Sequence, residues 1–174
     1  MNKDFLELIK SRTSVREFTG EPIPKEDILE IIKAGMSAPT ARDIRPWAFI
    51  PVTDRKLLDE LCNELPYAKM LDKASCAIIV CGEVDNDNGE DNKLWVCDCS
   101  AASENILLAA HAMGYGSVWT AAYPHSDRMD TVRKILSIPE KIIPLNVIPI
   151  GIQKDKNLKP KDKFNLENIH WERW

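Results

Sequence analysis

A short basic stretch, Arg12-Thr13-Ser14-Val15-Arg16, lies between a segment with helical periodicity and a segment rich in turn-forming residues. It holds two guanidinium groups and two hydroxyl groups and no acidic side chain. Arginine presents a fixed fork of donors that matches phosphate oxygens, and short hydroxyls can complete such a cradle. In a chain of net charge -4, this local positive charge indicates an anion site. The alternative is that Arg12 and Arg16 only complement the end of the first helix and stay in solvent.

The segments on either side of the basic stretch predict two helices. Phe5, Leu8 and Ile9 would share one face of a short helix before it. After it, the turn-forming residues 20–24 lead into a helix with Pro24 and two acids in its first turn. That helix carries a buried stripe at helical spacing, formed by Ile28, Ile31, Ile32 and Gly35.

The remaining pattern predicts an α+β fold with a mixed β-sheet flanked by helices. Strands are expected at 47–52, 77–81, 116–122 and 144–150, and the prolines of the last one indicate an edge strand or a broken ladder. Further helices are expected to begin at Asp54 and to cover 94–113 and 126–136. The segment 94–113 is apolar nearly all round and should be the central helix. The acidic segment 83–93 reads as a surface loop.

Composition narrows the class of protein. At 174 residues, 44% hydrophobic and 29% charged, the chain fits a single domain, residues 1–174. A pI of about 5.5 argues against a nucleic-acid partner, which requires a basic face. No apolar run approaches the roughly 20 residues of a membrane span, and the first residues lack the blocks of a signal peptide. We therefore expect a cytoplasmic protein with no membrane contact.

The five cysteines are expected to be free and mostly buried thiols, because their number is odd and several lie in apolar runs. Cys97, Cys99 and His111 match no standard zinc spacing, so no metal is expected. The final segment, 152–174, is polar at first yet ends in His-Trp-Glu-Arg-Trp. Its two tryptophans need a surface to cover, either on their own domain or on a second subunit.

Five short stretches occur in an order that resembles the nitroreductase family of FMN-dependent oxidoreductases, and the likeness covers nearly the whole chain. They are Arg-x-Ser-x-Arg at 12–16, Ala-Pro-Thr-Ala at 38–41 before Pro46-Trp47, Lys-Met-Leu at 69–71, Gly-Tyr-Gly-Ser-Val-Trp at 114–119, and Lys-Pro-Lys-Asp-Lys at 159–163 with its tryptophan-containing end. Each stretch alone is a weak signal, and the five together are a strong one.

The resemblance implies an FMN site, residue by residue. Arg12, Thr13 and Ser14 would hold the phosphate and ribityl chain, and Lys161 and Lys163 would close on the phosphate from the other end of the chain. Arg16 and, less securely, Lys69 would lie near the pyrimidine edge of the flavin. A cation there would favour the negative charge of the reduced ring. Thr120 and Ala121 would place their backbone at flavin N5 and O4.

The resemblance also implies a homodimer with FMN at the subunit interface. Pro39, Thr40 and Ala41 would cross that interface to the partner's flavin, and the segment 152–174 would wrap onto the partner subunit. The family often has an amide pair where this chain has Asp43 and Arg45. These two residues would either form a local ion pair or alter the mouth of the pocket.

The activity implied by the resemblance is two half-reactions at one site. NADH or NADPH would give hydride to flavin N5, and an acceptor such as a nitroaromatic or quinone would then be reduced on the same face. No protein acid or base is required, so no catalytic residue is predicted. The chain is short for the family and has no obvious insertion to cover the flavin, which implies an open pocket. Alternatives are dehalogenation or dehydrogenation on the same fold, or a flavin-binding sensor or carrier with little turnover.

Overall fold

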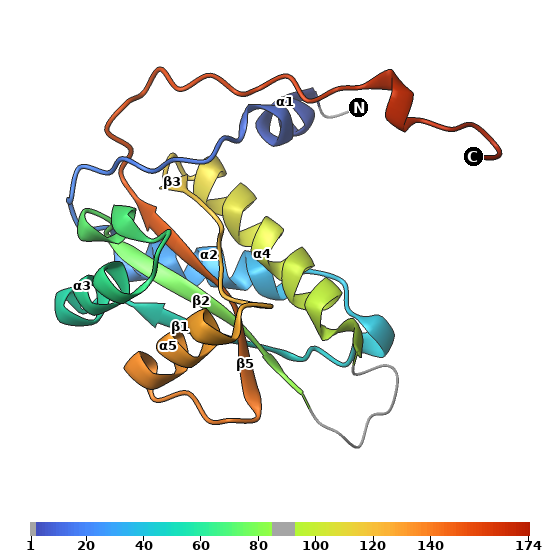
Figure 1. Ribbon diagram of the computed structural model, residues 1–174. Helices are drawn as coiled ribbons and strands as arrows, with labels where there is room; N and C mark the ends of the chain where they lie inside the picture. Colours follow the sequence, from blue (N-terminus) through green and yellow to red (C-terminus); the bar gives the residue numbers. More distant parts are fainter. Residues whose placement is uncertain (1–2, 85–92) are drawn as a thin grey trace.

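A five-stranded sheet lies at the centre of the computed structural model, which describes residues 3–84 and 93–174 (Figure 1). The strand order is β1-β2-β5-β3, and β4 also pairs with β5. The strands are β1 (Trp47–Val52), β2 (Cys76–Glu83), β3 (Gly116–Ser117), β4 (Thr120–Ala121) and β5 (Ile142–Gly151).

The α+β class is confirmed, with one refinement of the sheet. Every pairing recorded between these strands is antiparallel, and parallel pairing occurs only at the isolated bridge between Ser14 and Ser117. The sheet of the described residues is therefore antiparallel where we expected a mixed one. A βαβ unit joins two parallel strands, and the pairings of the described strands include none.

The two central strands, β2 and β5, separate two apolar cores. Along β2, Ile79 packs in a core with α3 (Arg55–Glu64) and α5 (Ser126–Leu136). Its neighbours Ile78 and Val80 pack in a second core with α2 (Lys25–Met36) and α4 (Trp95–Ala112). Successive strand residues point to opposite faces, so a continuous apolar run supplies both cores.

The last strand is central, so the expectation of an edge position was wrong and that of a broken ladder was right. β5 lies between β2 and the short strands β3 and β4. Pro149 lies opposite the gap between β3 and β4, and Pro144 lies beside the register shift at Val80 and Cys81. Proline cannot donate to a ladder, which accounts for interruptions at these points. The same gap divides the strand expected at 116–122 into two.

The helices follow the predicted pattern closely. The buried residues of α2 are the predicted Ile28, Ile31, Ile32 and Gly35. In α3, Asp54 caps the first turn by accepting a hydrogen bond of 3.1 Å from the Leu57 amide. None of the described helices is long and apolar enough to cross a membrane.

The two ends of the chain meet beside β3, where α1 (Lys3–Ser11) and the C-terminal tail lie together at the top of Figure 1. The amides of Thr19 and Lys154 each bond across this junction, to the carbonyls of Ile152 and Glu17 at 2.9 and 3.0 Å. Every residue from 154 to 174 is exposed, including the short helix η4 (Leu166–Asn168). Most of the predicted acidic loop at 83–93 falls outside the described residues.

Candidate functional site

The basic stretch 12–16 is fixed by one buried residue at its centre. Val15 is 2% exposed, and its amide donates to the Ser117 carbonyl at 2.9 Å. A Cβ atom at Gly116 would lie 2.7 Å from Val15, so only glycine allows this approach. Because side chains alternate along an extended segment, burying Val15 turns Ser14 and Arg16 outward.

A small cavity of about 220 Å³ lies between the basic stretch 12–16 and the lysines of the C-terminal tail. We call it the small cationic cavity. The residues that line it are Arg12, Thr13, Ser14, Arg16, Lys161 and Lys163. The tail leaves β5 beside Glu17 and brings its lysines back to the start of the chain. Four cations and two hydroxyls, with no acid in this lining, form a site whose chemistry suits a phosphate group. If Arg12 and Arg16 only complemented the end of α1 in solvent, the presence of Lys161 and Lys163 in the same cavity would have no explanation.

Arg12 is positioned by α4. Its side chain is only 15% exposed, and its Nε lies 3.6 Å from a carboxylate oxygen of Glu104. Further along α4, the Nε2 atom of His111 lies 2.9 Å from the hydroxyl of Ser11, the last residue of α1. Burial, with the nearby Arg12 charge, lowers the pKa of His111 below its ordinary value of 6.5. The histidine therefore favours its neutral form beside the cationic cavity.

A second cavity, of about 460 Å³, adjoins the first through Arg16, which lines both. Its other lining residues are Tyr67, Lys69, Met70, Val118, Trp119, Thr120, Ala121 and Arg128. Met70 and Trp119 supply apolar walls of the kind that hold a planar ring. The Thr120 hydroxyl donates to the Val147 carbonyl at 2.7 Å, which fixes β4 against β5 at the cavity wall.

Lys69 reaches this cavity in an unexpected way. Its ammonium donates to the carbonyls of Cys62 and Asn63, at 2.8 and 3.2 Å, at the end of α3. A cation at a helix C-terminus is well placed to satisfy these carbonyls. The stem of Lys69 therefore lines the cavity, while its charge is directed to the helix.

Comparisons with known proteins show the family of the chain. The protein-family model described as "Nitroreductase family" matches residues 9–66 and 62–152 of the sequence. This chain belongs to the nitroreductase family.

Relatives of this nitroreductase-family chain match it over almost their full length. A protein of Methanothermobacter thermautotrophicus, provisionally named NADH dehydrogenase/NAD(P)H nitroreductase, is 44% identical over 98% of this chain and 88% of its own. A crystal structure with the same provisional name, from Parabacteroides distasonis, is 50% identical, covers 98% of this chain and 99% of that one, and has a TM-score of 0.92. An FMN-dependent nitroreductase from Clostridium difficile is 26% identical, covers 97% and 99%, and has a TM-score of 0.88.

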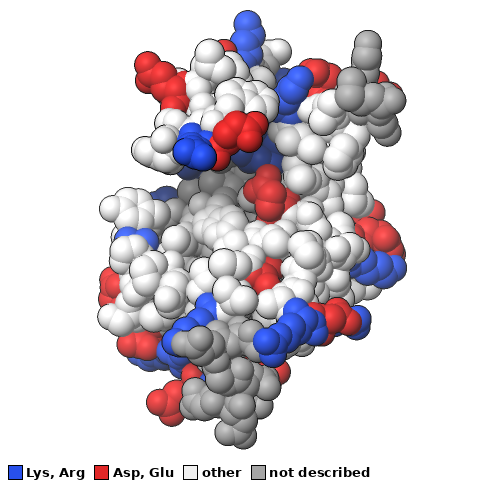
Figure 2. Space-filling model, turned by 90° about the vertical axis from the view of Figure 1, so that its right-hand side faces the viewer, with Lys and Arg blue, Asp and Glu red and all other residues white. Residues whose placement is uncertain are grey.

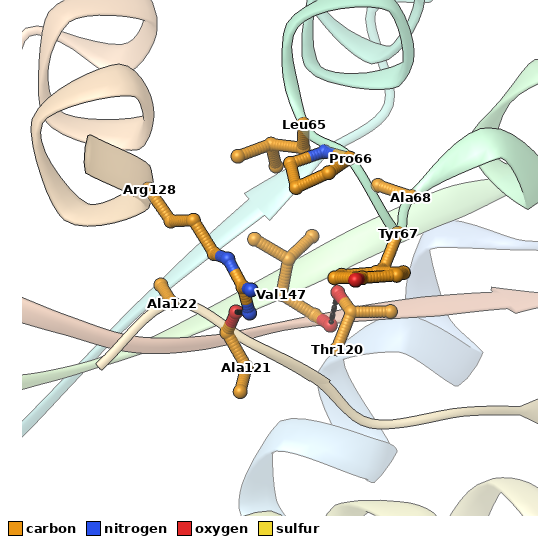
Figure 3. A pocket seen from close by; sticks show the side chains of 9 residues that line it. All are labelled: Leu65, Pro66, Tyr67, Ala68, Thr120, Ala121, Ala122, Arg128 and Val147. Atoms are coloured by element: carbon orange, nitrogen blue, oxygen red, sulfur yellow. Dashed lines mark hydrogen bonds between the residues drawn. The ribbon is translucent and has the colours of Figure 1, made fainter. Parts of the chain in front are cut away.

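Five residues that line the larger cavity were not predicted as site residues: Met70, Val118 and Trp119, which lie in the quoted motifs, and Tyr67 and Arg128, which do not. Arg128 extends from α5 toward β4 and Tyr67 (Figure 3). Its guanidinium carbon lies 5.0 Å from the centre of the Tyr67 ring, and its Nη1 lies 3.4 Å from the Ala121 carbonyl. No motif contains either residue, because the contact joins α5 to a turn that is distant from it in sequence.

The loop at Pro39, Thr40 and Ala41 lines neither of these two cavities. The Ala41 amide donates to the buried Asp98 carboxylate at 3.1 Å, in the first turn of α4. His111, which contacts the basic stretch, lies 13 residues further along this helix, about 20 Å away at 1.5 Å per residue. Within one chain the loop and the cationic cavity thus lie at opposite ends of α4.

Asp43 and Arg45 form the ion pair that was one of two expectations. Arg45 donates from Nε and Nη2 to the two carboxylate oxygens of Asp43, at 2.7 and 2.5 Å. The hydrogen bonds from Arg45 lower the pKa of Asp43. Both residues have a positive φ, near 55°, which is uncommon for residues other than glycine. The bidentate pair closes the turn before β1.

Proposed function

We propose that this chain is an FMN-dependent oxidoreductase that passes electrons from NADH or NADPH to a small acceptor such as a nitroaromatic or a quinone. The observation that carries the proposal is the pair of adjoining cavities joined by Arg16, one cationic and one walled by apolar and aromatic side chains. Their chemistry fits a ligand with a phosphate at one end and a planar ring at the other. The names of the relatives, which include NAD(P)H and FMN, support the same reading.

The residues of this chain would divide the work of binding. Arg12, Thr13, Ser14, Lys161 and Lys163 would hold the phosphate in the small cavity, and Arg16 would lie at the junction beside the pyrimidine edge of the ring. Backbone groups of Thr120 and Ala121 would face N5 and O4 at the wall of the larger cavity. We propose no charged role for Lys69, because its ammonium serves α3.

Bound FMN would supply the redox chemistry, accepting hydride at N5 from the nicotinamide and returning two electrons to the acceptor. The chain's own contribution would be orientation and charge. The Arg16 guanidinium would stabilise negative charge on the pyrimidine side of the ring. The apolar walls formed by Met70 and Trp119 would exclude water from one side of the site. No side chain needs to donate or accept a proton in this scheme.

We also propose that the active form is a homodimer. The tail exposes large apolar residues, with Trp171 at 81% and Trp174 at 100% exposure, and α1 exposes Phe5 at 55%. Figure 2 shows a hollow beneath the upper part of the molecule, on a face with much uncharged surface. In a dimer, the tail of each chain would wrap onto the other copy, and this exposed apolar surface would be covered. The dimer would also bring Pro39, Thr40 and Ala41 to the cofactor of the partner subunit. Within its own chain this loop lies at the opposite end of α4 from the small cationic cavity.

The test is whether the small cationic cavity contributes to binding through the phosphate of FMN. Riboflavin has the same ring as FMN and lacks the phosphate, so the ratio of their dissociation constants isolates the small cavity. We expect the variant Lys161→Gln/Lys163→Gln to reduce the preference for FMN by roughly 10- to 100-fold, since charge-assisted hydrogen bonds to phosphate are lost. Lys159→Gln, in the same tail but outside both cavities, is the matched control and should change the ratio little. An unchanged ratio in the double variant would contradict the proposed phosphate site.

A further inference from the structure

We infer that Arg128 and Tyr67 form a subsite for the carboxylate of an anionic aromatic acceptor, so that this enzyme prefers nitrobenzoate-like substrates to neutral ones. The inference rests on the proposed function, since it names the substrate class for the same site. Arg128 would be a residue that determines specificity.

The charge of the larger cavity is the first support. Its described lining contains three cations, Arg16, Lys69 and Arg128, and no acid. Two of these are already accounted for. Arg16 is shared with the phosphate cavity, and the Lys69 ammonium is bonded to the end of α3. Arg128 is the cation that remains for a second ligand.

The hydrogen-bonding state of Arg128 is the second support. It pairs with no carboxylate among the described residues, and its single hydrogen bond, to Ala121, is long at 3.4 Å. Its Nε is buried and has no partner. Arg133 on the same helix also has a buried Nε without a partner, but its Nη1 donates to Asp130 at 3.0 Å and its Nη2 donates to the Ile142 carbonyl at 3.3 Å. A planar carboxylate in the cavity could accept charge-assisted hydrogen bonds from the Nη groups of Arg128.

The geometry around Arg128 is the third support. Tyr67 is 69% exposed, and the guanidinium of Arg128 lies 5.0 Å from its ring centre and beside Ala121 of β4 (Figure 3). This contact holds the arginine in place before a ligand arrives. With the flavin ring held against Trp119 and Met70, the aromatic ring of an acceptor would stack on the flavin. An acceptor with a ring and a carboxylate would satisfy both parts.

The reaction on such an acceptor is balanced by the cosubstrate already proposed. NAD(P)H and one proton reduce the nitro group by two electrons to a nitroso group, with release of NAD(P)+ and one water molecule. The carboxylate takes no part in the chemistry and is retained in the product. Arg128 would therefore act on binding of the acceptor, not on the redox step.

The test compares 4-nitrobenzoate with its neutral analogue 4-nitrobenzamide on the FMN-loaded enzyme. We expect wild type to show a higher kcat/KM for nitrobenzoate, and Arg128→Gln to lower the nitrobenzoate-to-nitrobenzamide ratio by about 10-fold, the usual effect of losing a charge-assisted bond. Arg128→Lys should keep part of the preference. Lys134→Gln removes one charge from the exposed side of α5 and should leave the ratio unchanged.

A binding measurement separates recognition from turnover. Benzoate has no nitro group, and its dissociation constant can be measured through the change that it causes in the flavin spectrum. Arg128→Gln should weaken benzoate binding about 10-fold relative to wild type. Equal ratios for the two nitro compounds, or unchanged benzoate binding in Arg128→Gln, would overturn the inference. Failure of the protein to bind FMN, or to reduce either nitro compound, would instead overturn the proposed function.

Discussion

Arg16 lines both the small cationic cavity and the larger cavity, so under the proposed function its charge should affect both the binding of FMN and the reduction potential of the bound flavin. In Arg16→Gln we expect weaker FMN binding and a two-electron reduction potential more negative by roughly 20–30 mV, which corresponds to about 1 kcal/mol of lost stabilisation of the reduced ring. Potentiometric titration against a reference dye would measure this shift. Lys10→Gln, a charge loss on α1 outside both cavities, is the control, and an equal potential in Arg16→Gln and wild type would contradict the assigned position.

His111, whose ring contacts the Ser11 hydroxyl beside the basic stretch, gives the stability of the protein a pH dependence. Its pKa is lowered from 6.5, first by burial and then by Arg12, so the unfolded chain binds the extra proton more readily than the folded one. The contribution to stability is therefore fully present above pH 6.5 and is lost as the pH falls from 6.5 toward the lowered pKa of the folded state. We expect His111→Gln to lose less stability than wild type between about pH 7 and 5.5. Urea midpoints at several pH values would measure this, and parallel losses in the two proteins would refute it.

At the residue scale, the sequence predicted several residues that the structure brings together in the small cavity, and it did not predict Arg128 in the larger one. The cluster of Arg12, Ser14 and Lys161 could be anticipated because family motifs mark each residue and phosphate chemistry relates them. Arg128 could not be anticipated, because it lies in the first turn of an ordinary surface helix. Its meaning depends on Tyr67, which reaches it across the fold.

At the scale of elements, the segment 12–16 depends on its close contact with β3. Gly116→Ala would place a Cβ atom 2.7 Å from Val15. We expect a loss of about 1–3 kcal/mol in the free energy of unfolding, together with weaker FMN binding, because the basic stretch must move. Denaturation and FMN titration would measure the two effects.

Gly82→Ala provides the matched control for that prediction. The Cβ atom of an alanine at position 82 would lie 2.2 Å from the Trp95 ring, which belongs to the core with α2 and α4. Neither residue lines the two cavities. It should also destabilise the protein, while the FMN affinity of the folded fraction changes little. If Gly116→Ala lowered stability without lowering FMN affinity, the basic stretch would not be part of the binding site.

The elements themselves differ in how well sequence predicts them. The helices α2 and α5 lie where the pattern predicts, because capping and 3.6-residue periodicity are local properties. The position of β5 and the split between β3 and β4 depend on which strands pair, and pairing is non-local. Proline in β5 suggested an edge, yet a central strand tolerates Pro149 because the neighbouring ladder is interrupted there.

At the scale of the whole molecule, the exposed tail should be explained by a partner. We expect wild type to be a dimer, and Trp171→Ala/Trp174→Ala to raise the dimer dissociation constant by on the order of 100-fold, because each tryptophan would lose about 1.5–3 kcal/mol of burial. Sedimentation velocity over a range of concentrations would measure this. Lys156→Gln, an exposed tail variant, is the control, and a wild-type protein that binds FMN tightly as a monomer would contradict the dimer.

The most direct measurement is the visible spectrum of the purified protein with FMN, recorded without oxygen before and after addition of NADH or NADPH and then of 4-nitrobenzoate. We expect one FMN per chain, bleaching of the flavin bands by a nicotinamide cosubstrate, and return of the colour when the nitro compound is added. A protein that takes up no FMN would contradict the assignment of the two cavities. A protein that binds FMN but is bleached by neither cosubstrate would be a flavin-binding protein without this activity.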